Sequence, residues 1–311
     1  MQDSQPALNR FPDFLGIGTT RGGTTWLYIS LSRHPDVWMP PVKELNYFNK
    51  LQDGVRTIGI CRKRVLAVRV RDYLFGERKV STGDSLIETL KWDYQYFLRR
   101  RSEQWYRELF RPREGQLTGE ITPAYAIIPP EQVERVNRLN PKVKAIYILR
   151  DPVERAWSST VNHLARKQGR KMDKVPYSEI LKRAEYTAKM PRAWYAANIR
   201  KWRAVIGAER LFIGYMEEIQ SNPRELLSRI CQHLQIPAPP PEADRNIGSP
   251  VNTSRHYGTE MPPEIRYIVS RELLPIMEDT AELLGGYAVG WLERAKAVVA
   301  AGLPDPDTPG S

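Results

Sequence analysis

Short apolar runs recur along the chain and alternate with longer stretches in which apolar and polar residues follow a helical period. The runs predict buried strands, because a strand covered on both faces shows no regular polar alternation. They lie at residues 13–18, 117–121, 143–149 and 210–215. Strands that alternate with helices favour an α/β fold, with a central parallel sheet and helices on both faces.

Helical patterns fill most of the intervals between these runs. The predicted helices lie at 23–33, 62–76, 84–111, 130–139, 152–168, 177–188, 192–206, 222–235 and 262–284, the last interrupted near Pro275. Residues 236–250 are rich in proline and polar side chains and predict a loop. The composition of residues 304–311 is typical of a disordered tail. We therefore expect a single domain over residues 1–303, followed by a tail over 304–311.

The composition is typical of a soluble globular protein. Hydrophobic residues make up 41% of the 311 residues, and no apolar run reaches the ~18 residues that a membrane span requires. The first nine residues lack the apolar core of a signal peptide. Two cysteines, Cys61 and Cys231, are too few and too far apart to suggest a disulfide framework or a metal site. A reducing cytoplasm is the simplest location.

The chain carries a formal net charge of +11. This charge describes either a solvated basic surface or a surface that attracts a multiply anionic ligand. The basic residues are dispersed and no recognised nucleic-acid motif accompanies them, so nucleic acid is not the expected partner.

A glycine-rich turn follows the first predicted strand and leads into a helix. Such a turn points several backbone N–H groups and a helix N-terminus at one place, which makes a cradle for a phosphate. Gly18, Gly23, Thr24 and Thr25 have nearly the spacing of an ATP-binding P-loop, but Thr24 stands where the P-loop lysine is required. The cation in the loop is Arg21. The turn thus predicts phosphate binding without the group that reaches the β- and γ-phosphates of a nucleoside triphosphate.

Three stretches together resemble the sulfotransferases that use 3′-phosphoadenosine 5′-phosphosulfate (PAPS). The glycine-rich turn resembles their 5′-phosphosulfate loop, in which Lys-x-Gly-Thr-Thr follows the strand. Residues 145–158 resemble the strand, turn and helix that bind the 3′-phosphate. Residues 43–48 resemble the segment with the catalytic glutamate in the heparan-sulfate-type branch and its bacterial relatives. The stretches lie in the expected order, and the resemblance covers most of residues 12–290.

The resemblance implies a P-loop-type three-layer sandwich and a defined donor site. Backbone amides of the loop and the two threonine hydroxyls would hold the 5′-phosphate, and Arg150, Ser158 and Arg255 are candidates for the 3′-phosphate. The full set of expected donor-binding residues is Arg21, Gly22, Gly23, Thr24, Thr25, Trp26, Arg150, Ser158 and Arg255. Trp26 is expected to pack in the core behind the loop. Alternatives are ordinary helix capping by the threonines and pairing of Arg150 with Asp151. Arg155 is expected at the surface or in an ion pair.

The resemblance also implies the catalytic residues. Glu44 would be the general base that takes the proton of the acceptor, and Arg21 would stabilise the leaving phosphate where the family usually has lysine. An arginine can do so through charge and hydrogen bonds only, because it does not give up its proton. Residues expected on the acceptor side are Lys43, Tyr47, Glu120 and Tyr125, with contact to the donor open for Lys43. The structural alternatives to these functional roles are a surface Lys43–Glu44 pair and packing of Tyr125 over the sheet edge.

The sequence thus predicts a sulfotransferase that moves a sulfuryl group from PAPS to a hydroxyl, or less readily an amine, and releases 3′-phosphoadenosine 5′-phosphate (PAP) without a metal. The acceptor would be small, lipid-like or carrier-bound. Ile121 stands where heparan-sulfate-type enzymes often have lysine, which counts against a polysaccharide. The aromatic stretch 92–106 is either an acceptor wall or a core helix. The competing readings are a P-loop-type kinase or phosphotransferase and a nucleotide-binding module without catalysis.

Overall fold

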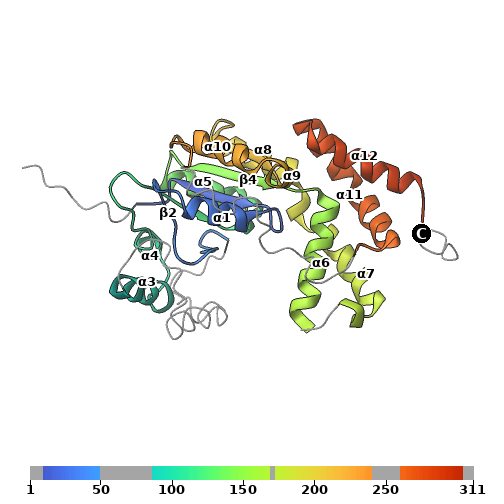
Figure 1. Cartoon of the computed structure of the whole chain (residues 1–311), viewed down its shortest axis with the longest axis horizontal. Helices are drawn as coiled ribbons and strands as arrows, with labels where there is room; N and C mark the ends of the chain where they lie inside the picture. The colour runs from blue at the N-terminus through green and yellow to red at the C-terminus, as the bar shows by residue number, and fades with distance from the viewer. Residues whose placement is uncertain (1–9, 50–85, 169–171, 240–259, 304–311) are drawn as a thin grey trace, which may run out of the picture.

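The computed structural model describes residues 10–49, 86–168, 172–239 and 260–303. Their centre is a sheet of five parallel strands in the order β2-β3-β1-β4-β5 (Figure 1). The strands are β1 (Phe14–Gly18), β2 (Val37–Trp38), β3 (Leu117–Ile121), β4 (Lys144–Leu149) and β5 (Leu211–Tyr215). Four of them confirm the predicted strands to within one residue. The two-residue β2, which pairs with β3, was not predicted because it is too short to show a pattern.

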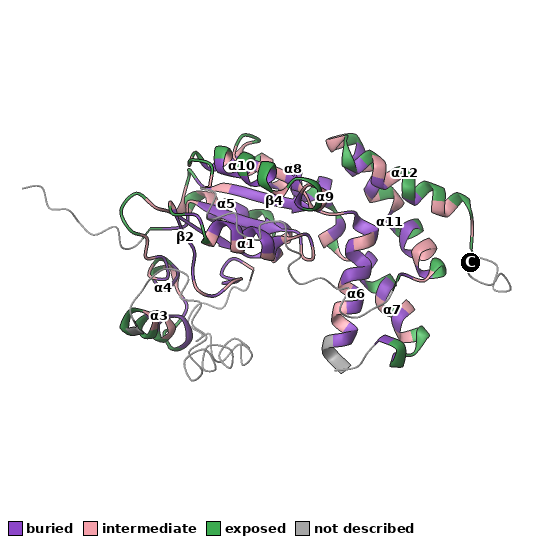
Figure 2. Cartoon of the chain, in the orientation of Figure 1, coloured by how far each residue is buried: buried purple, intermediate pink, exposed green. Residues whose placement is uncertain are grey.

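Helices cover both faces of this sheet, which confirms the three-layer α/β fold. Phe14 and Ile146 belong to one core cluster with residues of α1 (Thr24–Ser32) and α10 (Pro223–Leu234). Leu15 and Tyr147, their neighbours in sequence, belong to the other cluster with residues of α5 (Pro130–Leu139) and α8 (Tyr195–Ile206). Figure 2 shows the strands buried between these layers. The one-residue alternation arises because successive strand side chains point to opposite faces.

The remaining helices form two groups at opposite ends of the molecule. α6 (Pro152–Gln168), α7 (Tyr177–Ala188), α11 (Pro263–Leu284) and α12 (Tyr287–Ala300) lie at one end, and α3 (Leu86–Leu98) and α4 (Glu103–Arg107) at the other (Figure 1). α9 (Met216–Ser221) follows β5 directly, and short 3₁₀ turns occupy Pro123–Ile127, Met172–Lys174 and Pro191–Ala193. No helix among the described residues is long and apolar enough to cross a membrane.

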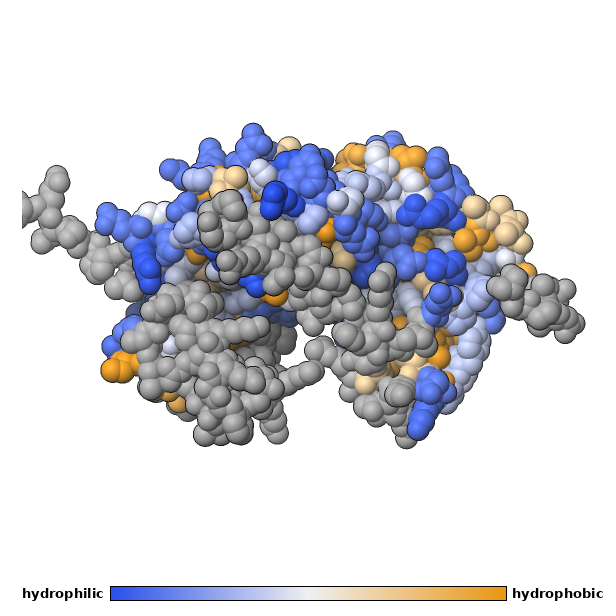
Figure 3. Space-filling view, viewed as in Figure 1, coloured by the Kyte–Doolittle hydropathy of each residue, from blue (hydrophilic) through white to orange (hydrophobic). Residues whose placement is uncertain are grey.

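Two helical expectations need correction, and one helix was not predicted. The helix predicted over 84–111 is broken, because Ser102 caps a new helix by accepting a hydrogen bond from Trp105 N. α11 continues through Pro275, although proline cannot donate the usual helical hydrogen bond there. α12 was not predicted, and its ends carry exposed hydrophobic residues that stand out in Figure 3.

The aromatic stretch is core rather than an exposed wall. Its buried members, which belong to the larger core cluster, are Trp92, Tyr96, Phe97, Trp105 and Tyr106. Tyr94 is the exposed member. The predicted helix 62–76, the loop containing Arg255 and the tail 304–311 lie outside the described residues.

Candidate active site

The turn between β1 and α1 is folded tightly against the end of β4. Thr19 N donates to Ile148 O at 2.6 Å, and Gly22 N donates to Thr19 O at 3.0 Å. Gly23 has φ +85°, and a Cβ there would lie 2.3 Å from Ile219 Cδ1. Glycine is therefore required at this position both by its backbone conformation and by the space available. The N-cap of α1 is Gly23, and Thr24 and Thr25 are the first two residues of the helix, so neither threonine stands at the capping position.

Arg150 extends from the end of β4 to this turn. Its Nη1 donates to the carbonyl of Arg21 at 2.9 Å, and Arg21 Nε donates to Ser158 Oγ at 2.9 Å. The two regions that the resemblance assigned to opposite ends of one nucleotide thus lie together. This follows from the sheet order, because β1 and β4 are parallel neighbours and their carboxyl ends meet at one edge.

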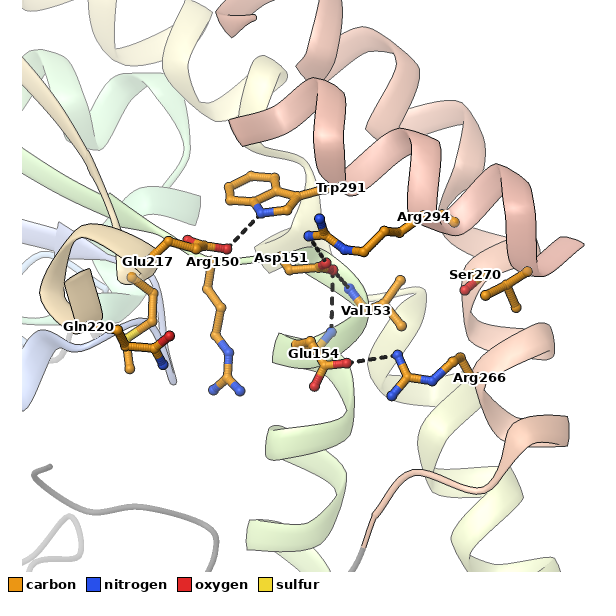
Figure 4. A pocket seen from close by; sticks show the side chains of 13 residues that line it. Arg150, Asp151, Val153, Glu154, Glu217, Gln220, Arg266, Ser270, Trp291 and Arg294 are labelled. Carbon is orange, nitrogen blue, oxygen red and sulfur yellow. Dashed lines mark hydrogen bonds and ion pairs between the residues drawn. The ribbon is translucent and has the colours of Figure 1, made fainter. Parts of the chain in front are cut away.

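Asp151 does not pair with Arg150. Its Oδ1 accepts from Val153 N at 2.9 Å at the start of α6, and its Oδ2 accepts from Arg294 at 2.9 Å. A cavity of about 310 Å³ lies beside these residues and includes Arg150 in its wall. Figure 4 shows Arg150 extending between α9 and α6, while Glu217 accepts from Trp291 across the cavity. Arg150 is thus held by the loop and is not neutralised by the adjacent carboxylate.

Lys43 lies directly over the start of α1. Its Nζ donates to Thr24 Oγ1 and to Thr25 Oγ1, each at 3.1 Å. Burial lowers the pKa of Lys43, the charge of Glu44 opposes this change and the charge of Arg21 adds to it. Together these effects leave the pKa at about 8. A P-loop-type loop whose own sequence lacks lysine therefore receives an ammonium from a separate segment, 19 residues further along the chain in the case of Thr24. Sequence spacing alone gave no signal that would place this lysine on the loop.

The segment from Glu44 to Tyr47 is anchored through its backbone to the end of β3. Glu44 N donates to Ile121 O at 3.2 Å, and the next three amides donate to Glu120, Thr122 and Tyr125. Glu44 has φ +64°, a conformation that non-glycine residues adopt rarely and that surrounding bonds must hold. Glu44 itself is half-buried. The backbone is thus fixed at the residue that the resemblance assigns as the base.

Glu120 is the centre of this anchor. It is fully buried, and its carboxylate accepts from Tyr106, Thr122 and Tyr125 as well as from Leu45 N. Burial raises the pKa of Glu120, while these hydrogen bonds oppose the change. The expectation that Glu120, Tyr125 and Tyr47 contact an acceptor is not supported by their positions, because all three are at most 2% exposed. Their contacts fit a positioning role: Tyr47 stacks on Tyr106 at 4.3 Å and accepts from Arg135.

Two further expectations concern Trp26 and Arg155. Trp26 is 4% exposed and packs in the core behind the loop, as expected, so its side chain is not presented to a ligand. The expectation that Arg155 lies at the surface or in an ion pair is wrong. This residue is 1% exposed, and its Nε and Nη2 have no hydrogen-bond partner among the described residues. The helical periodicity of α6 places Arg155 on the buried face of the helix, although its charge led us to expect an exposed position.

The described residues contain no group of three or more His, Cys, Asp or Glu side chains arranged to hold a metal ion.

These features define a P-loop-like α/β protein with a tight glycine-rich turn before a helix, a neighbouring arginine and a carboxylate on a fixed segment. The sequence model of the sulfotransferase family matches residues 12–240. The chain belongs to this family.

Curated relatives lie in the same family. The chain is 25% identical over 241 residues to human heparan sulfate glucosamine 3-O-sulfotransferase 6, which covers 75% of this chain and 55% of that protein. It is 28% identical over 141 residues to human heparan sulfate glucosamine 3-O-sulfotransferase 3B1, which covers 42% and 35%. The chain thus spans about half the length of the first relative.

Solved structures share the fold. A sulfotransferase from Alicyclobacillus acidocaldarius has a TM-score of 0.58 and 21% identity, covering 90% of this chain and 98% of that one. The sulfotransferase domain of the olefin synthase from Synechococcus PCC 7002 has a TM-score of 0.50 and 17% identity, covering 98% of this chain and 100% of that one.

Proposed function

We propose that this chain transfers a sulfuryl group from PAPS to an acceptor hydroxyl, with Glu44 as general base. The observation that carries the proposal is the meeting of three groups at one sheet edge: the turn of residues 19–25, Arg150, and Lys43. Family membership favours this reaction over the kinase or phosphotransferase and over a nucleotide-binding module without catalysis.

The residues at this edge suit a nucleotide with phosphate at both ends. The N-terminus of α1 and the amides of Arg21 and of residues 23–25 would hold the 5′-phosphate, because a helix N-terminus carries partial positive charge. Arg150 and Ser158 would hold the 3′-phosphate, since a guanidinium can donate two hydrogen bonds to one phosphate. Arg255 remains a proposed additional contact. A metal is not required in this scheme, because the loop, Arg21 and Lys43 supply positive charge.

Sulfuryl transfer needs a base for the acceptor proton and positive charge beside the leaving phosphate. Glu44 would take the proton from the acceptor oxygen as that oxygen bonds to sulfur and the bond from sulfur to the bridging oxygen of the donor breaks. Arg21 would stabilise the negative charge left on the phosphate of PAP. Lys43 would add to that stabilisation and, unlike arginine, can also give up a proton, because its lowered pKa of about 8 makes the neutral form accessible.

The proposed acceptor differs from the one for which the curated relatives are named. The curated relatives are named for sulfation of heparan sulfate glucosamine, whereas Ile121 replaces the lysine often found in that branch. We propose a small or carrier-bound acceptor that carries a hydroxyl, used in the cytoplasm.

The test replaces the base and leaves the donor site in place. Glu44→Gln keeps the size and hydrogen-bonding ability of the side chain but removes its basicity. Transfer of ³⁵S from labelled PAPS is measured with an acceptor found by screening wild-type protein, and PAP affinity is measured by calorimetry. A general base contributes ~10²–10⁴-fold, so transfer is expected to fall by that factor while the Kd for PAP stays within about twofold. Transfer at the wild-type rate would remove Glu44 from the mechanism, and a wild-type protein that binds no PAP would remove the proposed function.

A further inference from the structure

A second cavity lies on the other side of α6 from the one that contains Arg150. Its volume is about 390 Å³, and it lies between the glycine-rich turn, α6, α7 and the short turn that precedes α8. The lining includes Thr20 and Arg21 from the glycine-rich turn. No residue lines both cavities. A ligand here would touch the donor loop from the side away from the Arg150 cavity.

The lining of this second cavity is cationic. Four arginines and a histidine contribute to it, while no aspartate or glutamate is among its described lining residues; the basic residues are Arg21, Arg155, Arg183, Arg192 and His163. The first cavity differs, because Asp151, Glu154 and Glu217 stand among its arginines. The described lining of the second cavity therefore contains no carboxylate, in contrast to the lining of the first.

Several guanidinium nitrogens that line this cavity have no hydrogen-bond partner in the described part of the chain, although the Arg183 guanidinium also lies over the ring of Tyr186, 4.7 Å from its centroid. Arg155 is 1% exposed, and its Nε and Nη2 are both without a hydrogen-bond partner there; the buried Nε atoms of Arg183 and Arg192 are likewise unmatched. A buried charge without a counter-charge is costly and is normally paired. Burial lowers the pKa of Arg155, and the charges of Arg192 and Arg150 act in the same direction. An arginine nonetheless stays protonated, so its charge is available to an anionic ligand.

We infer that this cavity binds an anionic group of the acceptor substrate, a carboxylate, phosphate ester or sulfate ester, and so selects acidic acceptors. The inference rests on the proposed function, because it assigns the cavity to the acceptor of that reaction. Arginines suit all three groups, since the planar guanidinium matches their paired oxygens. Arg21 contributes to this cavity and also contacts Ser158 of the proposed donor site. An acceptor anchored here by its charged group would therefore present a hydroxyl close to the donor loop.

The experiment measures anion binding with the donor site already filled. Full-length protein is first titrated with PAP by calorimetry and then, saturated with PAP, is titrated with sodium sulfate against sodium chloride of equal ionic strength, with thermal unfolding as the readout. We expect a saturable sulfate response in the wild-type protein. The double variant Arg183→Gln/Arg192→Gln should bind sulfate at least about fivefold more weakly. The double variant Arg138→Gln/Arg271→Gln, an equal change of charge at exposed positions of α5 and α11, should behave as wild type.

A second measurement needs no variant. Phenylglyoxal modifies accessible arginines, and mass spectrometry of PAP-saturated protein reports which are modified. Sulfate should protect Arg183 and Arg192 and leave Arg271 reactive. A wild-type protein without a sulfate response beyond that of chloride, equal responses of the wild type and the double variant, or equal modification with and without sulfate would overturn the inference. Absent PAP binding in the first titration would instead count against the proposed function, so the two failures are distinguishable.

Discussion

Lys43 Nζ donates to Thr25 Oγ1 at 3.1 Å, which places an ammonium from one segment on the first turn of a helix that begins in another. The same ammonium donates to Thr24 at 3.1 Å. Thr24 occupies the position at which a P-loop carries its lysine. The lysine ammonium that the loop sequence lacks is thus supplied by Lys43 from a separate segment. We therefore predict that donor binding depends on the segment 43–47 as well as on the loop.

Replacing Lys43 should weaken the hold on the donor. Lys43→Met keeps most of the side-chain volume and removes the charge, so the Kd for PAP should rise by about tenfold, the factor expected for loss of a charge-assisted contact of about 1.5 kcal/mol. Lys43→Arg should retain more of the affinity because it stays charged. Calorimetry with PAP measures both. Equal affinities of Lys43→Met and wild type would show that this ammonium does not reach the nucleotide.

The pKa of Lys43 predicts a pH dependence. Its lowered value of about 8 means that the ammonium is present below pH 8 and is lost as the pH rises through that value in the unliganded protein. The affinity for PAP should therefore be level from pH 6.5 to 7.5 and fall above pH 8 toward the about tenfold weaker binding expected of the uncharged side chain. The pKa of Lys201 is also lowered to about 8, so Lys43→Arg serves as the control. The decline should disappear in that variant and would be assigned elsewhere if it persisted.

The buried Glu120 is predicted to act through position. Glu120→Gln and Tyr106→Phe each disturb a buried hydrogen bond, which costs about 1–3 kcal/mol of unfolding free energy when a buried partner is left unsatisfied. Because this network holds the backbone of residues 45–47, kcat should fall by about tenfold or more while the KM for PAPS changes less than threefold. Tyr94→Phe removes a hydroxyl from an exposed ring and should change neither quantity. A KM for PAPS that rises by the same factor as kcat falls would point to the donor site instead.

Gly23 and Gly115 offer a matched comparison of backbone strain and steric clash. Both have positive φ, +85° and +81°, but an added Cβ would meet Ile219 at 2.3 Å only at Gly23, whereas nothing lies within 4 Å at Gly115. Gly115→Ala should cost about 1 kcal/mol for conformation alone. Gly23→Ala should cost about 1–3 kcal/mol more, because the packed core must shift. Urea unfolding measures the difference, and equal losses would mean that the loop accommodates the methyl group.

The sequence predicted the sheet more reliably than the site. Buried runs such as 143–149 predict strands because both their faces are apolar, and the glycine spacing predicts a phosphate-binding turn. The contacts of Lys43 could not be predicted, since they depend on how a separate segment folds over α1. Charge misled the interpretation of Arg155, expected at the surface or in an ion pair, and of Glu120, expected to contact the acceptor, because the fold buries both side chains. Ser102 did give a usable signal, because serine is a preferred residue at the start of a helix, where its hydroxyl accepts a hydrogen bond from an amide of the first turn.

The central claim is that the glycine-rich turn and Arg150 bind opposite ends of one adenosine bisphosphate. Calorimetry of wild-type protein and Arg150→Ala with PAP, adenosine 5′-phosphate and ATP tests it most directly. Wild-type protein should bind PAP at least about tenfold more tightly than adenosine 5′-phosphate and more tightly than ATP, and the preference for PAP over adenosine 5′-phosphate should be lost in Arg150→Ala. Equal binding of PAP and adenosine 5′-phosphate by wild-type protein, or tight binding of ATP with no binding of PAP, would contradict it.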